Sequence, residues 1–567
     1  MAGVPFKRDT GAFSDRREIM RTLNLVLALA LAVAVPVAPA IAGDSVLVAS
    51  SKTAIATTTL GQVQGFRRDD VFTFRGIPYA TAQRFMPPQK VAAWSNVRPA
   101  LSYGNVCPQP VGSELREPQT FISDNRYWPQ SENCQNLNIW TKGLNDGKKR
   151  PVMVWLHGGG YFSGSSMDLP LYDGTRLSQR GDVVVVSINH RLNVLGFLDL
   201  SSYGADYAAS GNVSMLDIVA SLEWVRDNIA AFGGDPDNVT IFGQSGGGGK
   251  VSTLLAMPQA QGLYDKAIIQ SGIMGPPNPM SGDQALARRV AEATIAEAGL
   301  KPGDVAGLKA LPYDQLSAAG DRALRKISAE IAPGSGGPLG FPLVNWGPVV
   351  DGKVLPQAPF VTGAPAVSAN VPLLIGSTLN EFQRFPHPDL AGHETWGGTE
   401  ALAFFAKRYG DRAPAVLAAY KSAYPDMKPG EWPMVDIMGR AGTLRASTMK
   451  ATQPAPVYTY LFAWQSPVLD YAWAGGHSSD LAFTFDNIEA GIQSNGGGAE
   501  VQKLADVVSQ AWINFARAGD PNTPGLPKWD RYTATGGATM IFDTTSQART
   551  NHDRDLINLL SAPGPRK

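Results

Sequence analysis

The sequence contains a serine in a setting that suits a nucleophile. The segment Gly-Gln-Ser-Gly-Gly at 243–247, centred on Ser245, directly follows the apolar run 238–242, and residues 250–256 can begin a helix. A strand, a glycine-flanked turn and a helix expose a nucleophilic hydroxyl at a helix N-terminus. The glycines are required because a Cβ two residues to either side of the serine would collide with backbone. The alternative is an ordinary glycine turn whose serine does no chemistry.

A glycine-rich loop earlier in the chain could stabilise negative charge. A histidine and three glycines follow the apolar run 152–156. Acyl transfer needs N–H donors aimed at the oxygen that gains charge. We assign Gly159 and Gly160 to one side of this oxyanion hole and Gly246 to the other. The alternatives are a flexible loop or a phosphate-binding loop, but the Lys-Ser/Thr pair of a P-loop does not follow. His157 itself is predicted to be structural.

A serine nucleophile of this type needs an acid and then a histidine, both later in the chain. We predict His477 as the base, because it lies on a loop of small residues that would let the imidazole reach the serine. We predict Glu381 as the orienting acid, because it follows an apolar run, and open α/β sheets place their sites at the carboxyl ends of strands. A solvated surface carboxylate is the alternative for any single glutamate. The remaining histidines beyond the serine are His387, His393 and His552.

The elements around these motifs predict an open sheet with crossover helices. Runs 152–156 and 183–188 are apolar and β-branched without alternation, as expected of parallel strands covered on both faces. Apolar residues then recur at helical spacing over 214–232, before the strand that leads to the serine. Such a strand, helix and strand make a right-handed βαβ unit. We therefore predict an α/β fold with one catalytic domain at 43–567 and helical insertions between roughly 280 and 450.

Charge and composition limit the class of partner. The 567 residues include 49 Lys plus Arg and 49 Asp plus Glu, with 44% hydrophobic and 17% charged residues. This balance gives no general attraction to nucleic acid or anionic membranes, and the apolar fraction suits a globular core. The sequence predicts a small-molecule substrate of little or no charge, no nucleic-acid partner, and no metal or organic cofactor. The sequence gives no information about the oligomeric state.

Residues 1–42 have the order of a signal peptide. Arginines precede the apolar run 23–35, and small residues follow it. We predict cleavage after Ala42 and export to the periplasm or the extracellular space. A membrane anchor is the alternative, but the run is interrupted by prolines and short for a bilayer, so no stable span is expected after cleavage. Met20 is an alternative start, which would make residues 1–19 an upstream extension.

Further motifs carry a resemblance to a known family. They are FRGIPYA at 74–80, SENC at 131–134 followed by LNIW at 137–140, and FGGDP at 232–236. Together with the serine turn they resemble the type-B carboxylesterase and cholinesterase family across nearly all of the mature chain. The resemblance implies an α/β-hydrolase fold, with a central, mostly parallel sheet flanked by helices and carrying large helical insertions. It also implies a triad of the serine, His477 and Glu381, and it places Ser271 near the acid.

Cys107 and Cys134 are the two cysteines of the chain. An exported chain meets an oxidising compartment, so we predict that they form one disulfide. The resemblance implies the same bridge. A loop of this length would stabilise the fold by about 3.5 kcal/mol on the chain-entropy account. The alternative is two free buried thiols.

The predicted function is hydrolysis of small to medium apolar carboxylic esters through an acyl-serine intermediate. An amidase or a lipase on the same fold is an alternative, and so is a catalytically silent, cholinesterase-like binding protein, against which the intact serine, glutamate and histidine argue. Gln244 and Gly246 stand where the family usually has glutamate and alanine, so no subfamily's substrate preference is carried over. The glycines at 158–160 resemble the Gly-Gly-Gly-x loop of hydrolases associated with tertiary-alcohol esters, which implies room beside the reacting carbonyl.

Overall fold

A computed structural model describes residues 46–561, apart from 111–118, 124, 127, 274–281, 334–342, 383–389, 391 and 472–474. The predicted signal segment, 1–42, lies outside the described residues. Leu47–Lys567 form one compact unit. Among the described residues, no helix is long and apolar enough to cross a membrane.

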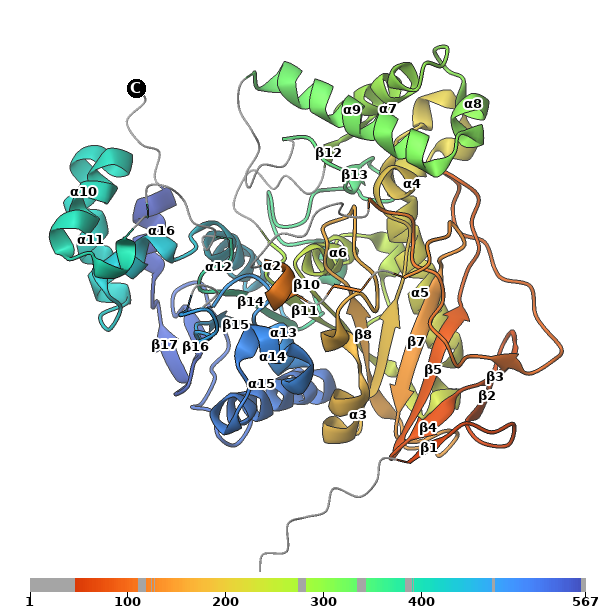
Figure 1. The fold of residues 1–567 in the computed structure, drawn as a ribbon, viewed down its shortest axis with the longest axis horizontal. Helices are drawn as coiled ribbons and strands as arrows, with labels where there is room; N and C mark the ends of the chain where they lie inside the picture. The colour runs from red at the N-terminus through yellow and green to blue at the C-terminus, as the bar shows by residue number, and fades with distance from the viewer. Residues whose placement is uncertain are drawn as a thin grey trace, which may run out of the picture. The chain divides into compact units, whose positions relative to one another are not determined.

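A mixed sheet runs through this unit (Figure 1). Its neighbouring strands, in spatial order, are β1 (Leu47–Val48), β4 (Phe66–Arg68), β5 (Val71–Pro78), β7 (Asn136–Thr141), β9 (Val184–Ile188), β8 (Arg150–Leu156), β10 (Gly234–Gln244), β11 (Lys266–Gln270), β14 (Leu373–Thr378), β15 (Val457–Phe462), β16 (Ala538–Phe542) and β17 (Gln547–Thr550). The strands from β9 to β16 are parallel, and antiparallel pairs flank them on both sides. Two small sheets pair β2 (Ile55–Thr58) and β6 (Arg98–Pro99) with β3 (Gly61–Gln64), and β12 (Gly282–Asp283) with β13 (Val349–Val350).

Helices occur along the whole unit, and some of them connect the parallel strands and cover the sheet. They are α2 (Gln119–Ile122), α3 (Thr175–Gly181), α4 (Asn193–Phe197), α5 (Val213–Asn228), α6 (Gly246–Leu254), α7 (Gln284–Glu297), α8 (Val305–Ala310), α9 (Tyr313–Ile331), α10 (Gly398–Tyr409), α11 (Ala413–Ala423), α12 (Met438–Lys450), α13 (Leu481–Thr484), α14 (Ile492–Asn495), α15 (Ala499–Ala518) and α16 (Arg554–Ser561). Helices α7 to α12 lie where the sequence predicts helical insertions. Of these, α7 packs against α9 and α10 against α11 (Figure 1).

The central strands are buried on both faces, which explains their unbroken apolar runs. Along β8, Val152 and Val154 pack into one core, which also contains residues of α5 and α6. Met153 and Trp155 pack into a second core with Trp512 of α15. Successive side chains of a strand point to opposite faces, so a strand covered on both sides needs apolar residues at every position.

The predicted elements around the serine are present with small shifts in their ends. The run 152–156 lies in β8, and the run 183–188 lies in β9 apart from its first residue. The helix predicted over 214–232 is α5, which ends at Asn228 and continues as a 3₁₀ turn, Ile229–Phe232. In the sheet β8 lies between β9 and β10, so the connection through α5 passes over one strand.

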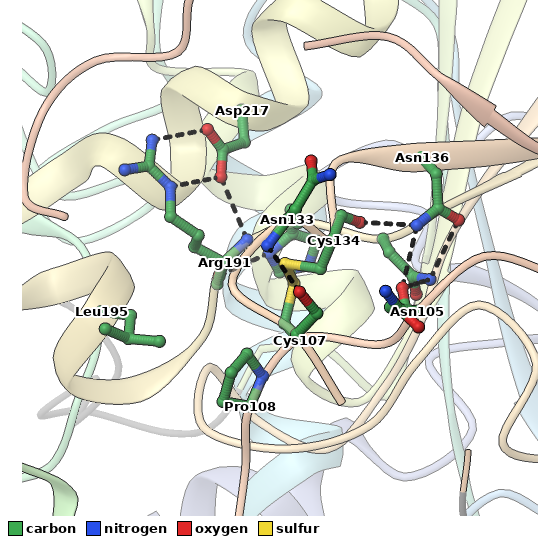
Figure 2. Close-up of a disulfide and its surroundings, with 12 residues drawn as sticks. Asn105, Cys107, Pro108, Asn133, Cys134, Asn136, Arg191, Leu195 and Asp217 are labelled. Carbon is green, nitrogen blue, oxygen red and sulfur yellow. Dashed lines mark hydrogen bonds and ion pairs between the residues drawn. A yellow bond between two sulfur atoms is a disulfide. The ribbon is translucent and has the colours of Figure 1, made fainter. Parts of the chain in front are cut away.

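A disulfide joins Cys107 to Cys134, 27 residues apart, which confirms the predicted bridge (Figure 2). Both cysteines are buried and pack against Leu192. Beside them Arg191 donates from Nη2 to Asp217 Oδ1 at 2.6 Å, and both of these side chains are also buried (Figure 2). The bridge closes a loop before β7, and the ion pair ties the segment after β9 to α5. The packing of Leu192 on the two cysteines brings these two parts of the chain together.

Candidate active site

Ser245 lies at the turn between β10 and α6, in a strained backbone conformation. Its φ is +57° and its ψ is −126°. Its N–H donates to the main-chain oxygen of Gln270 on the adjacent strand β11 at 2.8 Å. Non-glycine residues adopt positive φ rarely and at a cost of about 1–3 kcal/mol, so the surrounding structure must hold it there.

The glycines around the serine are required by close backbone packing. A Cβ on Gly243 would lie 2.5 Å from the carbonyl carbon of Gly247. A Cβ on Gly247 would lie 2.0 Å from the main-chain oxygen of Leu156 at the end of β8. No side chain fits at these distances, in agreement with the collision expected from the sequence.

The glycine loop after β8 lies directly against the first turn of α6. A Cβ on Gly246 would lie 2.1 Å from the main-chain oxygen of Gly160. Gly159 and Gly160 have φ values of +83° and +63°, which other residues rarely adopt. A Cβ on Gly159 would also lie 2.4 Å from the main-chain oxygen of Ser163, and one on Gly160 2.5 Å from the ring of Phe162. The structure thus brings the three glycines assigned to the oxyanion hole together.

His477 and Glu381, 96 residues apart in the chain, are directly paired. His477 Nδ1 lies 2.5 Å from Glu381 Oε2. The main-chain N–H of His477 also donates to the main-chain oxygen of Glu381 at 2.9 Å. The N–H of Asn380 donates to Gly475 at 3.1 Å, so main-chain bonds join the loop after β14 to the loop before α13. This pairing fixes the orientation of the imidazole.

The Glu381 carboxylate is buried and keeps its charge through specific partners. Its Oε1 accepts a hydrogen bond from the Thr378 N–H at 2.8 Å. Burial acts to raise its pKa, but the charge of His477 and hydrogen bonds to the carboxylate more than offset burial and lower the pKa below its ordinary value. Ser271 contributes to this lowering, although its hydroxyl forms no hydrogen bond of good geometry. Ser271 therefore lies near the acid, as the resemblance implies.

Two further buried carboxylates flank this pair, and the sequence patterns did not single them out. Asp480 Oδ2 accepts hydrogen bonds from Gln270 Nε2 and Tyr460 Oη, each at 2.9 Å. Asp436 Oδ2 accepts from the N–H of Gly439 at 2.7 Å. Burial raises the pKa of Asp480 to about 6, and burial with the nearby Glu381 charge raises the pKa of Asp436 to about 7. Three buried carboxyl groups thus lie close together at this end of the sheet.

The second ring nitrogen of His477 contacts the side chain that precedes the serine. Because Nδ1–H points to Glu381, Nε2 is the acceptor, and the buried Gln244 amide lies 3.3 Å from it. Within the described part of the chain, no hydrogen bond joins Ser245 Oγ to this nitrogen. Hydrolases without substrate often show long or misaligned contacts between nucleophile and base. Gln244 stands where the family usually has glutamate, and this departure is the sequence feature that could have drawn attention to the position.

The other histidines lie in different settings. His157 is buried, with its ring stacked 4.9 Å from that of His190, in agreement with its predicted structural role. His393 Nδ1 contacts the main-chain oxygen of Leu390 at 2.9 Å. His552 packs edge-on against Tyr424, and burial lowers its pKa to about 4. His387 lies outside the described residues. Of the residues described, no cluster of three or more His, Cys, Asp or Glu side chains could hold a metal ion.

We expect Asp480 to make stability depend on pH. Its pKa is about 6 in the folded state, above the ordinary value of 3.8. Between these values the folded chain holds the proton and the unfolded chain does not, so the unfolding free energy falls as pH rises through this window. In an Asp480→Asn variant this contribution is absent, so the unfolding free energy does not fall for this reason as pH rises. Its stability relative to wild type should therefore increase by about 1–3 kcal/mol between pH 4 and pH 7.

Urea unfolding of both proteins at several pH values in this range measures the difference. Gln270 and Tyr460 can still donate to the asparagine oxygen, so the substitution removes the charge and keeps these bonds. Parallel stability profiles for the two proteins would show that Asp480 titrates normally.

The sequence matches the family described as the carboxylesterase family over residues 52–557. This match spans nearly the whole described unit, including the serine turn, the glycine loop and the paired histidine and glutamate. The chain belongs to the carboxylesterase family. It is a carboxylic ester hydrolase with the α/β-hydrolase fold, which confirms the fold class, the family and the enzyme class expected from the sequence.

Several relatives of this carboxylesterase carry the names of hydrolases or esterases. A para-nitrobenzyl esterase of Bacillus subtilis is 35% identical over 502 residues, covering 86% of this chain and 95% of the relative. Phenmedipham hydrolase of Pseudarthrobacter oxydans is 32% identical, covering 86% of this chain and 94% of the relative. Among solved structures, an esterase from Clostridium hathewayi that can hydrolyse aliphatic aromatic polyesters has a TM-score of 0.81 at 37% identity, covering 91% of this chain and 99% of that one.

Proposed function

We propose that this carboxylesterase cleaves small to medium apolar carboxylic esters through an acyl-serine intermediate, with Ser245, His477 and Glu381 as its triad. The observation that carries the proposal is the buried pairing of His477 Nδ1 with Glu381 Oε2 at 2.5 Å, which leaves Nε2 as the proton acceptor on the side of the serine turn. A carboxylate that orients a histidine and stabilises its imidazolium form is the arrangement that a serine hydrolase needs.

In the first half of the reaction, Ser245 Oγ attacks the ester carbonyl carbon and His477 Nε2 takes the hydroxyl proton. The carbonyl oxygen becomes negative, and the C–O bond to the alcohol then breaks as the imidazolium returns the proton to the leaving alcohol. Before attack, Ser245 must replace the Gln244 amide at Nε2. In the second half, water repeats the attack on the acyl-enzyme and releases the carboxylic acid and the free serine.

The three glycines provide the proposed oxyanion hole. Main-chain N–H groups of Gly159, Gly160 and Gly246 would donate to the negative oxygen of both tetrahedral intermediates. The direct contact between Gly160 and the first turn of α6 supports this assignment, since it brings the backbones of the two segments together next to the serine turn. Loss of one such donor typically lowers kcat by about 100–1,000-fold in other hydrolases.

A substrate panel tests the proposed substrate class. We would assay p-nitrophenyl esters of increasing acyl length beside a matched p-nitroanilide and an emulsified long-chain triglyceride. Highest kcat/KM on short to medium acyl esters supports the proposal. Preference for the anilide would instead indicate an amidase, and preference for the emulsion a lipase. Absence of turnover on every compound would favour a silent binding protein.

We also propose that the chain is exported, with residues 1–42 removed after Ala42. The disulfide between Cys107 and Cys134 supports this destination, because such bonds persist in oxidising compartments. Expression of the full chain and mass measurement of the mature protein would test it. An N-terminus that begins at Gly43 supports the proposal, whereas an intact leader on active protein in the cytoplasm contradicts it.

We expect this esterase to hydrolyse tert-butyl acetate measurably, more slowly than the matching primary ester. Gly158, Gly159 and Gly160 carry no side chains on the proposed carbonyl wall, and a quaternary carbon next to the ester oxygen needs space there. Part of the space beside the loop is occupied, because Ser163 and the Phe162 ring lie against it. We therefore expect a low rate relative to the primary ester.

The assay measures tert-butanol release by wild type and by the Ser245→Ala variant, under conditions where butyl acetate is readily cleaved. Release of tert-butanol that depends on Ser245 would agree with free space beside the glycine loop. Rapid butyl acetate turnover with no detectable tert-butanol would show that the loop and its neighbours leave too little space.

A further inference from the structure

A fully buried lysine lies on the helix that begins at the proposed nucleophile. Lys250 is five residues after Ser245 on α6, and its side chain has no measurable exposure. Its Nζ donates to the main-chain oxygen of His157 at 2.8 Å. His157 is the residue at which the chain leaves β8 and enters the glycine loop. The ammonium group therefore holds the first end of that loop against α6.

A second contact from the same helix holds the other end of the loop. The Tyr161 hydroxyl lies 3.2 Å from Thr253 Oγ1, and because Thr253 donates to the Gly249 oxygen, it accepts from Tyr161. Thr253 is three residues after Lys250, so the two side chains lie on one face of α6. Lys250 Nζ also lies 6.0 Å from the centre of the Tyr161 ring, within range of a cation–π contact. Both ends of the segment 157–161 are thus bonded to α6.

The segment between these contacts has no side chains of its own to hold it. Three consecutive glycines are the most flexible backbone a chain can offer, and ordering them is entropically unfavourable. The proposed oxyanion hole needs their N–H groups at a fixed distance from Gly246, which is the first residue of α6. Bonds from α6 to both ends of the loop meet this need, because one rigid helix then positions both sets of donors.

The charge of Lys250 is costly at this position, which argues for a role beyond packing. Burial lowers its pKa to about 7, with the charge of Asp168 opposing the shift. The side chain of Asp168 is half-buried, with its Oδ1 atom shielded from solvent, and burial raises its pKa to about 7. An apolar residue of similar volume at such a site is often as stabilising as a buried charge or more so. The hydrogen bond to His157 is the feature that an apolar residue would not supply.

We propose that Lys250 is a positioning residue which, together with Thr253, sets the distance between the glycine loop and the nucleophile helix. This inference rests on the proposed function, because it takes Gly159, Gly160 and Gly246 as the oxyanion hole. Lys250 acts through the backbone of His157 and does not touch the substrate. Its effect is therefore on transition-state stabilisation rather than on substrate binding.

Lys250→Met tests the proposal, since methionine has a similar length and no N–H donor. We expect kcat on p-nitrophenyl butyrate to fall by about 10–100-fold, with KM changed by less than about threefold, because the oxyanion contact strengthens in the transition state. Thr253→Val removes the second contact and should lower kcat with the same KM pattern. If Lys250→Met fails to fold, the kcat of Thr253→Val becomes the test. An unchanged kcat in Thr253→Val then overturns the proposal.

Lys450→Met is the matched control. Lys450 is equally buried, and its Nζ donates to the main-chain oxygen of Ser368 at 2.5 Å. Lys450 is the last residue of α12. The rise of an α-helix places it about 18 Å along the axis from Met438, the first residue of α12. We expect Lys450→Met to lose stability and to retain wild-type kcat. An equal loss of kcat in both lysine variants would overturn the proposal, because it would show that Lys250 contributes only to the general stability of the fold.

Affinity for a trifluoromethyl ketone gives a second readout. This probe forms a tetrahedral adduct with a serine and places a negative oxygen in the hole. Its inhibition constant should rise in Lys250→Met by the same factor by which kcat/KM falls, whereas affinity for butyrate should not change. An unchanged inhibition constant overturns the proposal. A Ser245→Ala variant that stays active would instead refute the proposed function, so the two failures are distinguishable.

Discussion

Ser245→Ala should lower ester turnover by about four to six orders of magnitude while leaving the fold intact. The proposed acyl-enzyme cannot form without the serine oxygen, and only binding and the oxyanion donors remain to accelerate attack by water. The strained φ of +57° at this position is not a barrier to folding of the variant, because alanine at the same φ costs about the same as serine.

The measurement compares kcat on p-nitrophenyl butyrate for wild type, Ser245→Ala and Ser494→Ala. Ser494 is a matched control, since its hydroxyl donates only locally, to the Gly491 oxygen at 2.8 Å. Labelling with a fluorophosphonate followed by peptide mass analysis should place the adduct on Ser245 in the wild type and leave Ser245→Ala unlabelled. Folded Ser245→Ala with near-normal turnover would refute the assignment of the nucleophile.

His477→Ala should have the second largest effect, a loss in kcat of about four orders of magnitude or more. In the proposed mechanism the imidazole takes the serine proton, and its pairing with Glu381 at 2.5 Å would hold the tautomer that this transfer needs. Removing the ring would remove both the proposed proton acceptor and the cation that Glu381 would stabilise.

Three other histidines of the chain provide the controls for this variant. His387→Ala, His393→Ala and His552→Ala should each retain near-normal kcat under conditions where the variant is folded. Circular dichroism and thermal unfolding of each protein separate lost activity from lost structure. If folded His477→Ala retains substantial turnover and one of the control variants is inactive, the role of base must be reassigned to that control residue.

Local patterns in the sequence were sufficient for the elements and for most of the proposed site. The apolar runs that form β8 and β9 are unbroken because both faces of the sheet are covered. An unbroken apolar run can be recognised in the sequence alone. The glycines at 159, 160 and 246 could be assigned because the glycine loop after a strand and the glycine after the serine are recognisable motifs. Close backbone approach explains why glycine stands at each of these positions. The disulfide followed from the presence of two cysteines in the chain.

Glu381 shows where local information becomes insufficient. Its position after a strand narrows the choice of acid, since parallel strands present their carboxyl ends at one edge. Spacing alone does not distinguish it from a solvated surface glutamate. Its burial and its bond to a histidine 96 residues away are properties of the folded chain.

The sequence by itself determined the fold class, the family, the glycine-flanked serine turn and the disulfide of this protein, because each depends on residues near one another in the chain or on composition. Only the tertiary structure decided what surrounds them: the contact of Gln244 with His477, the buried carboxylates Asp436 and Asp480, and the bond from Lys250 to the glycine loop. These contacts join segments far apart in the sequence, and whether a buried polar group finds such a partner depends on how the strands and helices pack.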